Sequence, residues 1–436
     1  MSPAAQYDVA IVGGRCAGAP LAVHLARLGL RVCVLDRAHF PSDTPSTHII
    51  QPRGTAALER LGARAALDAA GAAPLRRYTL LYDGVTLDAD LCDPRADRHL
   101  STGNTPGLCV RRTVLDEVLL RAAADAGADV RTRTAATALL RDGERVSGVR
   151  TAAGDVRARV VVGADGRKSF VAREVDAREY AVYPAPRMAA WAYFEGAADD
   201  GGRLRIGRIG TSALLACPTD GGLQLAGVVP AISQRTAFLA DRDKAFATEL
   251  RRWPALAGVL DGAERVGPMR VVPDWRGYLR SATGPGWVLT GDAGNFKDPS
   301  AAQGITDALR QAETLSSALV RGLDADGDPD HELRQWGRWR DKDCRDMHWF
   351  AAGMAAAGPA GPVMREMIRD VAERDGGLPF AALLNRDLRS TDLLTARRAG
   401  SAVLRAVSSG PAAIRPVTRD VVRLAREQAR AVLPQR

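Results

Sequence analysis

The chain has 436 residues, and this length is enough for two or three domains with a sizeable core. Of these residues, 46% are hydrophobic. No apolar run approaches the length of a membrane span, and no basic segment precedes an apolar stretch at the N-terminus, so we expect neither a spanning helix nor a signal peptide. The net charge of +9 comes almost wholly from arginines spread along the chain, which argues against a nucleic-acid-binding protein. Six cysteines without metal-ligand spacing favour free thiols in the cytoplasm and no metal site.

The first 36 residues predict a β–α–β unit. An apolar strand (7–12) runs into the turn GGRCAG (13–18), a helix ends near Gly29, and a second buried strand (30–36) ends at Asp36. Helix N-terminal amides after a glycine turn suit a pyrophosphate, and a carboxylate at the end of the second strand suits an adenosine ribose. Arg15 replaces the middle glycine of the G-x-G-x-x-G fingerprint, and we expect its guanidinium to pair with the phosphates. A β–α–β unit without a ligand is the alternative.

Two later stretches decide the class. VVVGADGRKS (160–169) is a strand followed by the turn G-A-D-G. GWVLTGDAGNFKDPSAAQGITDALRQAE (286–313) combines a strand, a G-D pair, a proline turn and an amphipathic helix. Together with the first motif, these motifs resemble, in order and spacing, the FAD-dependent aromatic hydroxylase superfamily (class A flavoprotein monooxygenases), which also includes geranylgeranyl-reductase-like enzymes and flavin-dependent halogenases. The resemblance covers about residues 5–325, and GRCAGAP and STHII are similar to an actinobacterial subgroup.

The resemblance implies a contact for each motif. Asp292 is expected to bind the ribityl chain of FAD, and Asp165 to lie near the pyrophosphate. The amides of Gly304 and Ile305, at the positive end of a helix dipole, are expected to face the pyrimidine end of the reduced flavin. Family members usually have glycine where Ala301 stands, which narrows the space beside the flavin in this chain.

The segments at 42–62, 110–123 and 130–139 add further contacts by resemblance. Arg112, rather than Arg111, matches a cofactor-contacting position, Ala136 lies in the strand that binds adenine, and Arg53 matches a flavin-side arginine. His48 is the only histidine placed to meet flavin or substrate, where a neutral imidazole donates a hydrogen bond or acts as an acid. A loop histidine without a catalytic function is the alternative. The expected cofactor contacts are Gly13, Gly14, Arg15, Cys16, Ala17, Gly18, Asp36, Arg37, Thr47, Arg53, Arg112, Ala136, Asp165, Gly291, Asp292, Pro299, Gly304 and Ile305.

The expected fold is α/β: a Rossmann-like FAD-binding domain of the glutathione-reductase-2 or p-hydroxybenzoate-hydroxylase (PHBH) type, an inserted antiparallel sheet for substrate, and a helical C-terminal tail. Strand-like runs broken by glycine and proline indicate the inserted sheet, and helical periodicity indicates the tail. We expect the FAD-binding domain at 1–72, 96–179 and 275–328, the substrate domain at 73–95 and 180–274, and the helical region at 329–436. The aromatic residues of the tail, between 336 and 350, are expected to pack.

The resemblance implies an FAD monooxygenase of secondary metabolism that uses NAD(P)H and O2 to oxygenate an aromatic or polyketide-like small molecule. A reductase or dehydrogenase of the geranylgeranyl-reductase type is the second reading, and a non-catalytic flavoprotein that binds an unstable intermediate is the third. A halogenase is less favoured because no W-x-W-x-I-P motif is present. No second glycine fingerprint exists for NAD(P)H, which suits either transient docking of the nicotinamide or a separate flavin reductase as partner.

Overall fold

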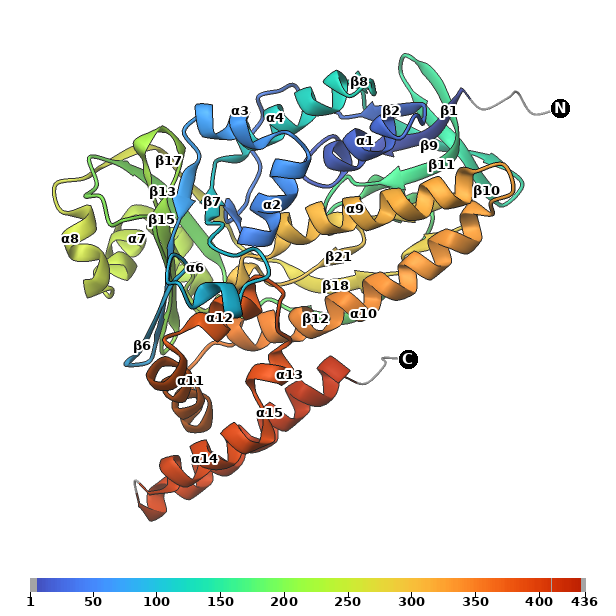
Figure 1. Cartoon of the computed structure of the whole chain (residues 1–436). Coiled ribbons are helices and arrows are strands. Elements are labelled where there is room, and N and C mark those ends of the chain that lie inside the picture. Colours follow the sequence, from blue (N-terminus) through green and yellow to red (C-terminus); the bar gives the residue numbers. More distant parts are fainter. Residues whose placement is uncertain (1–5, 409, 433–436) are drawn as a thin grey trace.

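The computed structural model describes residues 6–408 and 410–432 (Figure 1). Its largest sheet has eight strands, and β1, β2, β8, β11 and β20 pair in parallel in the order β20-β11-β1-β2-β8. Buried aliphatic runs such as VVVG at the end of β11 explain a parallel sheet that is covered on both faces. The strands are β1 (Tyr7–Val12), β2 (Val32–Leu35), β8 (Asp129–Arg131), β9 (Ala136–Asp142), β10 (Arg145–Thr151), β11 (Gly154–Gly163), β19 (Thr283–Gly284) and β20 (Trp287–Leu289).

Three helices cover one face of this sheet. α1 (Gly18–Arg27), α4 (Arg112–Asp125) and α9 (Gly304–Leu323) share a core with the alternate side chains of β1 and β2. α5 (Phe170–Glu174) and the β9–β10 hairpin enclose a second core on the other face. The carboxyl ends of β1, β2, β11 and β20 therefore meet at one edge, where ligands bind in open α/β sheets.

A second sheet has seven strands in the order β17-β13-β16-β15-β14-β5-β6. α6 (Arg235–Ala240), α7 (Arg242–Leu250) and α8 (Ala257–Leu260) lie over one face of it in Figure 1. The other face joins a core with residues of α10–α12. The strands are β5 (Arg77–Tyr82), β6 (Val85–Asp90), β13 (Ala189–Glu195), β14 (Arg203–Ile209), β15 (Ser212–Pro218), β16 (Gln224–Val228) and β17 (Glu264–Val272).

Two small sheets connect the large ones. One contains β3 (Ile49–Ile50), β4 (Ala73–Leu75) and β7 (Gly107–Cys109), and the other contains β12 (Glu179–Pro184), β18 (Arg276–Arg280) and β21 (Asn295–Phe296). α2 (Pro52–Arg60) follows β3 and packs on α9, and α3 (Arg64–Ala69) follows α2. The small sheets thus link the edge of the parallel sheet to the seven-stranded sheet.

The last quarter of the chain is mainly helical in the residues described. α10 (Pro329–Ala355) packs along α9, and α11 (Pro362–Asp375), α12 (Leu378–Leu384), α13 (Ser390–Leu393), α14 (Ala396–Val407) and α15 (Ile414–Val432) follow it. Figure 1 shows α14 and α15 at the lower edge of the molecule. Within residues 6–408 and 410–432, no helix combines the length and apolarity needed to cross a membrane.

The predicted α/β class with a Rossmann-like sheet is confirmed, and two local predictions are wrong. The seven-stranded sheet is not wholly antiparallel, because β5 pairs with β14 in parallel. The strand expected at 130–139 is two strands, β8 and β9, and Arg133 between them has a left-handed φ of 53°. The domain boundaries stay a prediction.

Candidate cofactor and active site

The glycine turn after β1 lies against the G-A-D-G turn after β11. Gly13 has a φ of 104°, and a Cβ there would lie 2.4 Å from the carbonyl oxygen of Ala164. A Cβ on Gly18 would lie 1.8 Å from the carbonyl oxygen of Gly13. Both glycines are therefore required by backbone packing. The first and second motifs consequently form one surface.

Asp36, at the end of β2, faces the same turn. Its Oδ2 accepts a hydrogen bond from the amide of Gly14 at 2.9 Å, and its Oδ1 accepts one from the amide of Ala38 at 2.8 Å. The amide of Thr134 binds the carbonyl oxygen of Asp36, which brings the start of β9, with Ala136, beside this carboxylate. The backbone just before β9 is therefore hydrogen-bonded to the end of β2, and Arg37, next to Asp36, is exposed.

Arg15 is held by the start of α4 and by the 42–48 loop. Its Nη1 donates to Oδ2 of buried Asp116 at 2.8 Å, and its Nη2 donates to the Ser42 hydroxyl at 2.9 Å. Asp116 also accepts from Nε of Arg112 at 2.9 Å and from the thiol of Cys16 at 3.3 Å. Asp116 thus organises three expected cofactor residues, and the sequence reasoning missed it. Its position four residues after Arg112 on one helix was the available signal.

The G-D motif closes the same surface from the side of β20. A Cβ on Gly291 would lie 2.8 Å from Cβ of Ala17, so the third motif touches the first. Burial raises the pKa of Asp292, although nearby cations that include Arg112 oppose this shift. The carboxylate of Asp292 has no hydrogen bond or ion pair with any residue between 6 and 408 or 410 and 432. A partly buried carboxylate without a partner is suited to a ligand that supplies hydroxyl groups.

The start of α9 leaves an open space in front of Gly304. Gly304 is exposed, and a Cβ built on it would have no other atom within 4 Å. The first amides of a helix have no intrahelical acceptor, so those of Gly304 and Ile305 are free to meet a ligand. Pro299 and Ala301 form the short turn before the helix, and Ala302 follows with a φ of 49°. No described residue would clash with a side chain at position 304. The open space in front of this residue is therefore available to an aromatic ring system.

Two expected contacts are engaged elsewhere. The carboxylate of Asp165 accepts from the hydroxyl of Ser169 at 2.5 Å and from the amide of Phe170 at 2.6 Å, so it caps α5. Arg53 forms an ion pair with Asp387 in the C-terminal region. Asp165 reaches the glycine turn through its backbone, and Arg53 joins α2 to the helical tail. Thr47 is half-buried just before His48.

His48 lies where the 42–48 loop meets the seven-stranded sheet. Its Nε2 is 2.5 Å from the hydroxyl of Tyr193 on β13, and its ring stacks on that phenol at 5.9 Å between centroids. Burial lowers the pKa of His48 to about 3, and the cations of Arg112 and Arg111 act in the same direction. Burial raises the pKa of Tyr193 to about 12. Both side chains are therefore neutral near pH 7, and Nδ1 of His48 is buried with no partner among the described residues.

An ion-pair network joins Lys297, just before the 299–302 turn, to α9 and the C-terminal helices. Lys297 is buried and donates to Asp307 at 2.6 Å, and Arg310 links Asp307 to Asp343 on α10. Arg386 from the C-terminal region also contacts Asp343 at 3.0 Å. These side chains connect α9, α10 and the tail, and the sequence reasoning did not identify them.

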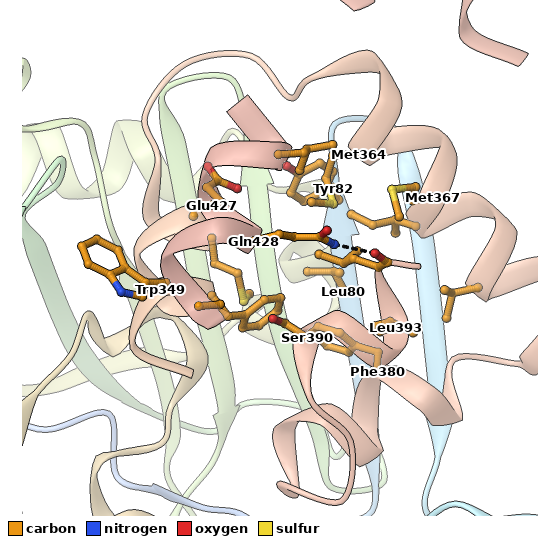
Figure 2. Close-up of a pocket in the computed structure, with 18 of the residues that line it drawn as sticks. Leu80, Tyr82, Trp349, Met364, Met367, Phe380, Ser390, Leu393, Glu427 and Gln428 are labelled. Carbon is orange, nitrogen blue, oxygen red and sulfur yellow. Dashed lines mark hydrogen bonds between the residues drawn. The ribbon is translucent and has the colours of Figure 1, made fainter. Parts of the chain in front are cut away.

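A narrow apolar cavity of about 80 Å³ lies between the seven-stranded sheet and the C-terminal helices (Figure 2). Leu80 and Tyr82 of β5 form its floor, and methionines of α10 and α11 form part of its wall. The inner side of α15, with Glu427 and Gln428, closes it. A cavity of about 150 Å³ holds benzene, so this smaller one has no room for an aromatic ring unless its flexible methionine walls move.

One row of side chains joins this cavity to the His48 region. Cross-strand pairing aligns Trp191, Gly227, Leu215, Ile206, Leu80 and Leu87 across five strand boundaries. Paired residues share one face of a sheet, so the row lies on the face that carries Tyr193. Trp191 contacts His48 edge-on, with ring centroids 6.4 Å apart. Four strand spacings of about 4.8 Å put Leu80 about 19 Å from Trp191.

The residues at the sheet edge fit FAD. Along this edge lie, in order, the Asp36 carboxylate after β2, the glycine turn after β1, the unpartnered Asp292 carboxylate after β20 and the open space at Gly304. This order matches the adenosine ribose, pyrophosphate, ribityl chain and ring system of FAD. Gly304 leaves room for a ligand at the start of α9, because a Cβ there would have no other atom of the described residues within 4 Å.

Comparison with known families agrees with this assignment. Residues 6–333 match a family model described as an FAD binding domain. The chain belongs to this FAD-binding family. It is an FAD-dependent oxidoreductase of the aromatic hydroxylase and halogenase superfamily, as the three motifs predict.

The relatives that match this chain are named for different reactions. A tryptophan 2-halogenase of Chondromyces crocatus is 26% identical over 331 residues, 72% of this chain and 61% of that protein. A menaquinone reductase of Mycolicibacterium smegmatis is 27% identical over 346 residues, which covers 72% of this chain and 76% of the reductase. A 6-methylpretetramide 4-monooxygenase of Streptomyces rimosus is 29% identical over 342 residues, or 73% of this chain and 76% of the monooxygenase.

The fold is shared with solved flavoprotein structures. The myxobacterial chondrochloren halogenase CndH superposes with a TM-score of 0.74 at 21% identity, over 99% of this chain and 98% of CndH. The flavin-dependent brominase Bmp2 gives a TM-score of 0.73 at 20% identity, over 93% of this chain and all of that one. The superposition with CndH extends through the C-terminal helices, which lie outside the matched family model.

Proposed function

We propose that the protein is an FAD-dependent monooxygenase that uses NAD(P)H and O2 to oxygenate an aromatic or polyketide-like small molecule. FAD reduced by a nicotinamide supplies the activation of O2 in such enzymes. The unpartnered nitrogen of His48 between the cofactor edge and the apolar sheet face carries the proposal. The relative named 6-methylpretetramide 4-monooxygenase supports the substrate class.

His48 and Tyr193 would act as one unit in this reaction. If the Tyr193 hydroxyl donates to Nε2, the hydrogen of the neutral imidazole lies on Nδ1, which then points a donor at the substrate or the oxygen being transferred. A buried donor without an acceptor costs about 1–3 kcal/mol, which a bound ligand would recover. The apolar row beside Trp191 would exclude water from that donor.

The cofactor-binding residues would hold FAD without taking part in bond formation. Asp292 would accept hydrogen bonds from ribityl hydroxyls, and the amides at the start of α9 would stabilise negative charge on the reduced ring. Arg112, fixed by Asp116, would keep a positive charge beside them. NAD(P)H would dock transiently, or a separate reductase would deliver reduced flavin.

Reduction of a C=C bond is the second candidate. The menaquinone reductase relative covers 72% of this chain, and the monooxygenase relative covers 73% of it. Halogenation through a reactive lysine is less favoured. Three of the four lysines are exposed, and Lys297 is buried in an ion pair with Asp307.

Measured O2 dependence separates these reactions. NAD(P)H oxidation by the FAD-loaded protein is measured with a panel of aromatic polyketides, phenols and terpenoids, in air and without O2, with and without halide. We expect substrate-stimulated oxidation only in air, with one atom of isotope-labelled O2 in the product. Product formation without O2 would contradict oxygenation and establish a reductase, and a halogenated product that requires halide would establish a halogenase.

Asp292→Ala tests the cofactor site separately from the reaction. Loss of a charged hydrogen-bond acceptor weakens binding by about 1.5–3 kcal/mol, which lowers FAD affinity about ten- to a hundredfold. FAD titration of the FAD-free variant measures this, and Asp68→Ala on the surface of α3 is the control. Equal FAD affinity in Asp292→Ala and wild type would remove Asp292 from the site.

A further inference from the structure

Much of the protein's positive charge is concentrated in its last two helices. Residues 396–432 contain eight arginines, two acidic residues and no lysine, a net charge of +6 out of +9 for the whole chain. α14 and α15 lie at the outer edge of the molecule, away from the parallel sheet (Figure 1).

The exposed surface of the same two helices is also unusually apolar. Among the described residues, nine large hydrophobic side chains are exposed, and five of them belong to this pair or to the short turn between them. Leu404 is 71% exposed, Ile414 55% and Val432 63%. Hydrophobic side chains that are exposed singly are normal on a protein surface. A cluster of them, here beside a basic patch, indicates an interaction site.

α15 arranges these side chains in two parallel stripes. At 100° per residue, Ile414, Val421, Ala425 and Val432 fall on one line along the helix, and Arg415, Arg419, Arg426 and Arg430 fall on the adjacent line. The third side, with Val417, Asp420 and Leu424, is buried against the protein. At 1.5 Å per residue, the apolar stripe is about 27 Å long and the arginine stripe about 22 Å.

Three of the four arginines on this exposed line of α15 form no ion pair with a described residue. Arg415, Arg419 and Arg426 form no ion pair with a residue in 6–408 or 410–432, whereas Arg423 on the inner side binds both Asp420 and Glu427. Arg430 lies over the ring of Trp349. A surface groove runs along Arg419, Arg426 and Arg430, and Arg423 and Glu427 line both that groove and the apolar cavity below.

We propose that the outer face of α14 and α15 docks on a membrane surface that contains anionic lipids. An amphipathic helix with an apolar stripe beside a basic stripe lies in the interface plane, where aliphatic side chains enter the acyl boundary and arginines meet phosphate headgroups. A protein partner is less suited to this face, because its exposed hydrophobic residues are all aliphatic, whereas cores of protein interfaces are enriched in aromatic anchors. The proposal is independent of the reaction at the flavin.

Vesicle sedimentation tests the proposal with the full-length, FAD-loaded protein. We expect binding to vesicles of equal parts phosphatidylglycerol and phosphatidylcholine, and none to pure phosphatidylcholine. Each basic residue near an anionic surface contributes roughly a factor of five, so the triple variant R415Q/R419Q/R426Q should bind about a hundredfold more weakly. Raising the salt from about 0.1 M to about 1 M should also release the protein, because the Debye length falls from about 10 Å to about 3 Å.

The control removes the same charge elsewhere. R242Q/K244Q/R251Q changes three exposed cationic residues on and just after α7, over the far side of the seven-stranded sheet, and should bind vesicles like the wild type. I414S/V421S/V432S keeps the charge and should also lose binding, while FAD content and circular dichroism show that each variant folds. Equal loss in the α7 control would reduce the effect to net charge and overturn the proposal. No binding to anionic vesicles, with self-association that the α15 variants abolish, would assign the face to a dimer instead.

Discussion

At the scale of single residues, Arg15 shows how a cation is accommodated in a glycine turn. A guanidinium has five N–H donors, and three of those of Arg15 are engaged by Asp116 and Ser42. The remaining two are free to meet a phosphate at the N-terminus of α1. The two contacts also fix the direction of the side chain, so a ligand would not have to order it.

Arg15→Gly restores the common fingerprint and tests this arrangement. Asp116 keeps its bond to Arg112, so we expect the variant to fold. If Arg15 pairs with the pyrophosphate, a charged contact of about 1.5–3 kcal/mol is lost and FAD affinity falls about ten- to a hundredfold, more at low salt. FAD titration at two ionic strengths measures the change, with exposed Arg242→Gly as the control. Affinities within about threefold of wild type would mean that Arg15 is tolerated without a role.

His48 gives a prediction for stability against pH. Its pKa is about 3 in the folded protein and about 6.5 in the unfolded chain, so between these values only the unfolded chain binds the proton. The free energy of unfolding therefore falls as pH decreases through this window, by about 1.4 kcal/mol per pH unit from His48 alone. His48→Asn tolerates the left-handed φ of 64° and should show a shallower slope in denaturant titrations. The exposed His39→Asn should keep the wild-type slope, and equal slopes in all three proteins would contradict the assignment.

Several residues of the site could be predicted because local sequence determines them. A strand, a glycine turn and a helix place Gly13 and Asp36 at one sheet edge, and the structure brings them together with Asp292 as expected. Their contact with FAD stays a prediction. Tyr193 was not predicted, because its partner His48 lies 145 residues earlier in the sequence. Asp116 could have been recognised from its spacing to Arg112, but its contact with Arg15 joins residues 101 apart. Periodicity carries no information about such pairs.

At the scale of elements, α9 has one face that packs against other helices and an N-terminus that stays open. Its buried face packs on α1 and α2, which explains the apolar spacing after Ile305. At its N-terminus, a side chain at position 304 would contact no other described residue, yet the residue there is glycine. Gly304 was identified in the sequence by the family resemblance, because helix propensity gives no signal at the first residue of a helix.

Gly304→Ala separates the effect of this residue on stability from its effect on FAD binding. Alanine meets no atom of the protein and restricts the unfolded chain, so the FAD-free variant should be as stable as wild type or more stable by about 0.4–1 kcal/mol. The added methyl group would occupy the space expected for the flavin, so FAD affinity should fall at least tenfold. Thermal melting and FAD titration give the two values. Gly400→Ala in α14, also without neighbours within 4 Å, should change stability only. Unchanged FAD affinity in Gly304→Ala would place the ring elsewhere.

Strand pairing in the seven-stranded sheet illustrates what the sequence could not provide. The runs at 203–209 and 212–218 have the alternation of strands, and they form a hairpin. Nothing in their composition indicates that β5, about 125 residues earlier, adds in parallel to β14. That pairing depends on how the chain leaves the parallel sheet and returns, which is a property of topology.

At the scale of the whole molecule, the network around Asp307 joins the 299–302 turn to the C-terminal helices. Asp307→Asn would leave Lys297 buried without its carboxylate, which costs about 3–5 kcal/mol of the free energy of unfolding. Arg310 and Arg386 keep Asp343, so K297M/D307N should recover most of the loss. Denaturant unfolding of the single and double variants measures both, and Asp324→Asn at the exposed end of α9 is the control. A double variant as unstable as Asp307→Asn would show that Lys297 is not the cause.

The tail itself was predicted only as helical. Hydrophobic periodicity indicated α10 and α15, but not that α11–α13 close a cavity over β5 and β6. Trp336 and Trp339 pack in the main core as expected, whereas Trp349 and Phe350 line the cavity. The difference depends on which side of α10 meets the sheet, and that is decided by contacts between distant parts of the chain.

The two sides of α15 have a thermodynamic consequence. Arg423 and Glu427 line both the outer groove and the inner cavity, so one helix is a wall of two compartments. A helix cannot shift to suit an occupant on one side without changing the space on the other. If a contact on the outer face alters the affinity of the cavity for its ligand, that ligand must alter the outer contact by the same factor. Any coupling that passes through α15 would be reciprocal in this way and would need no change near the flavin.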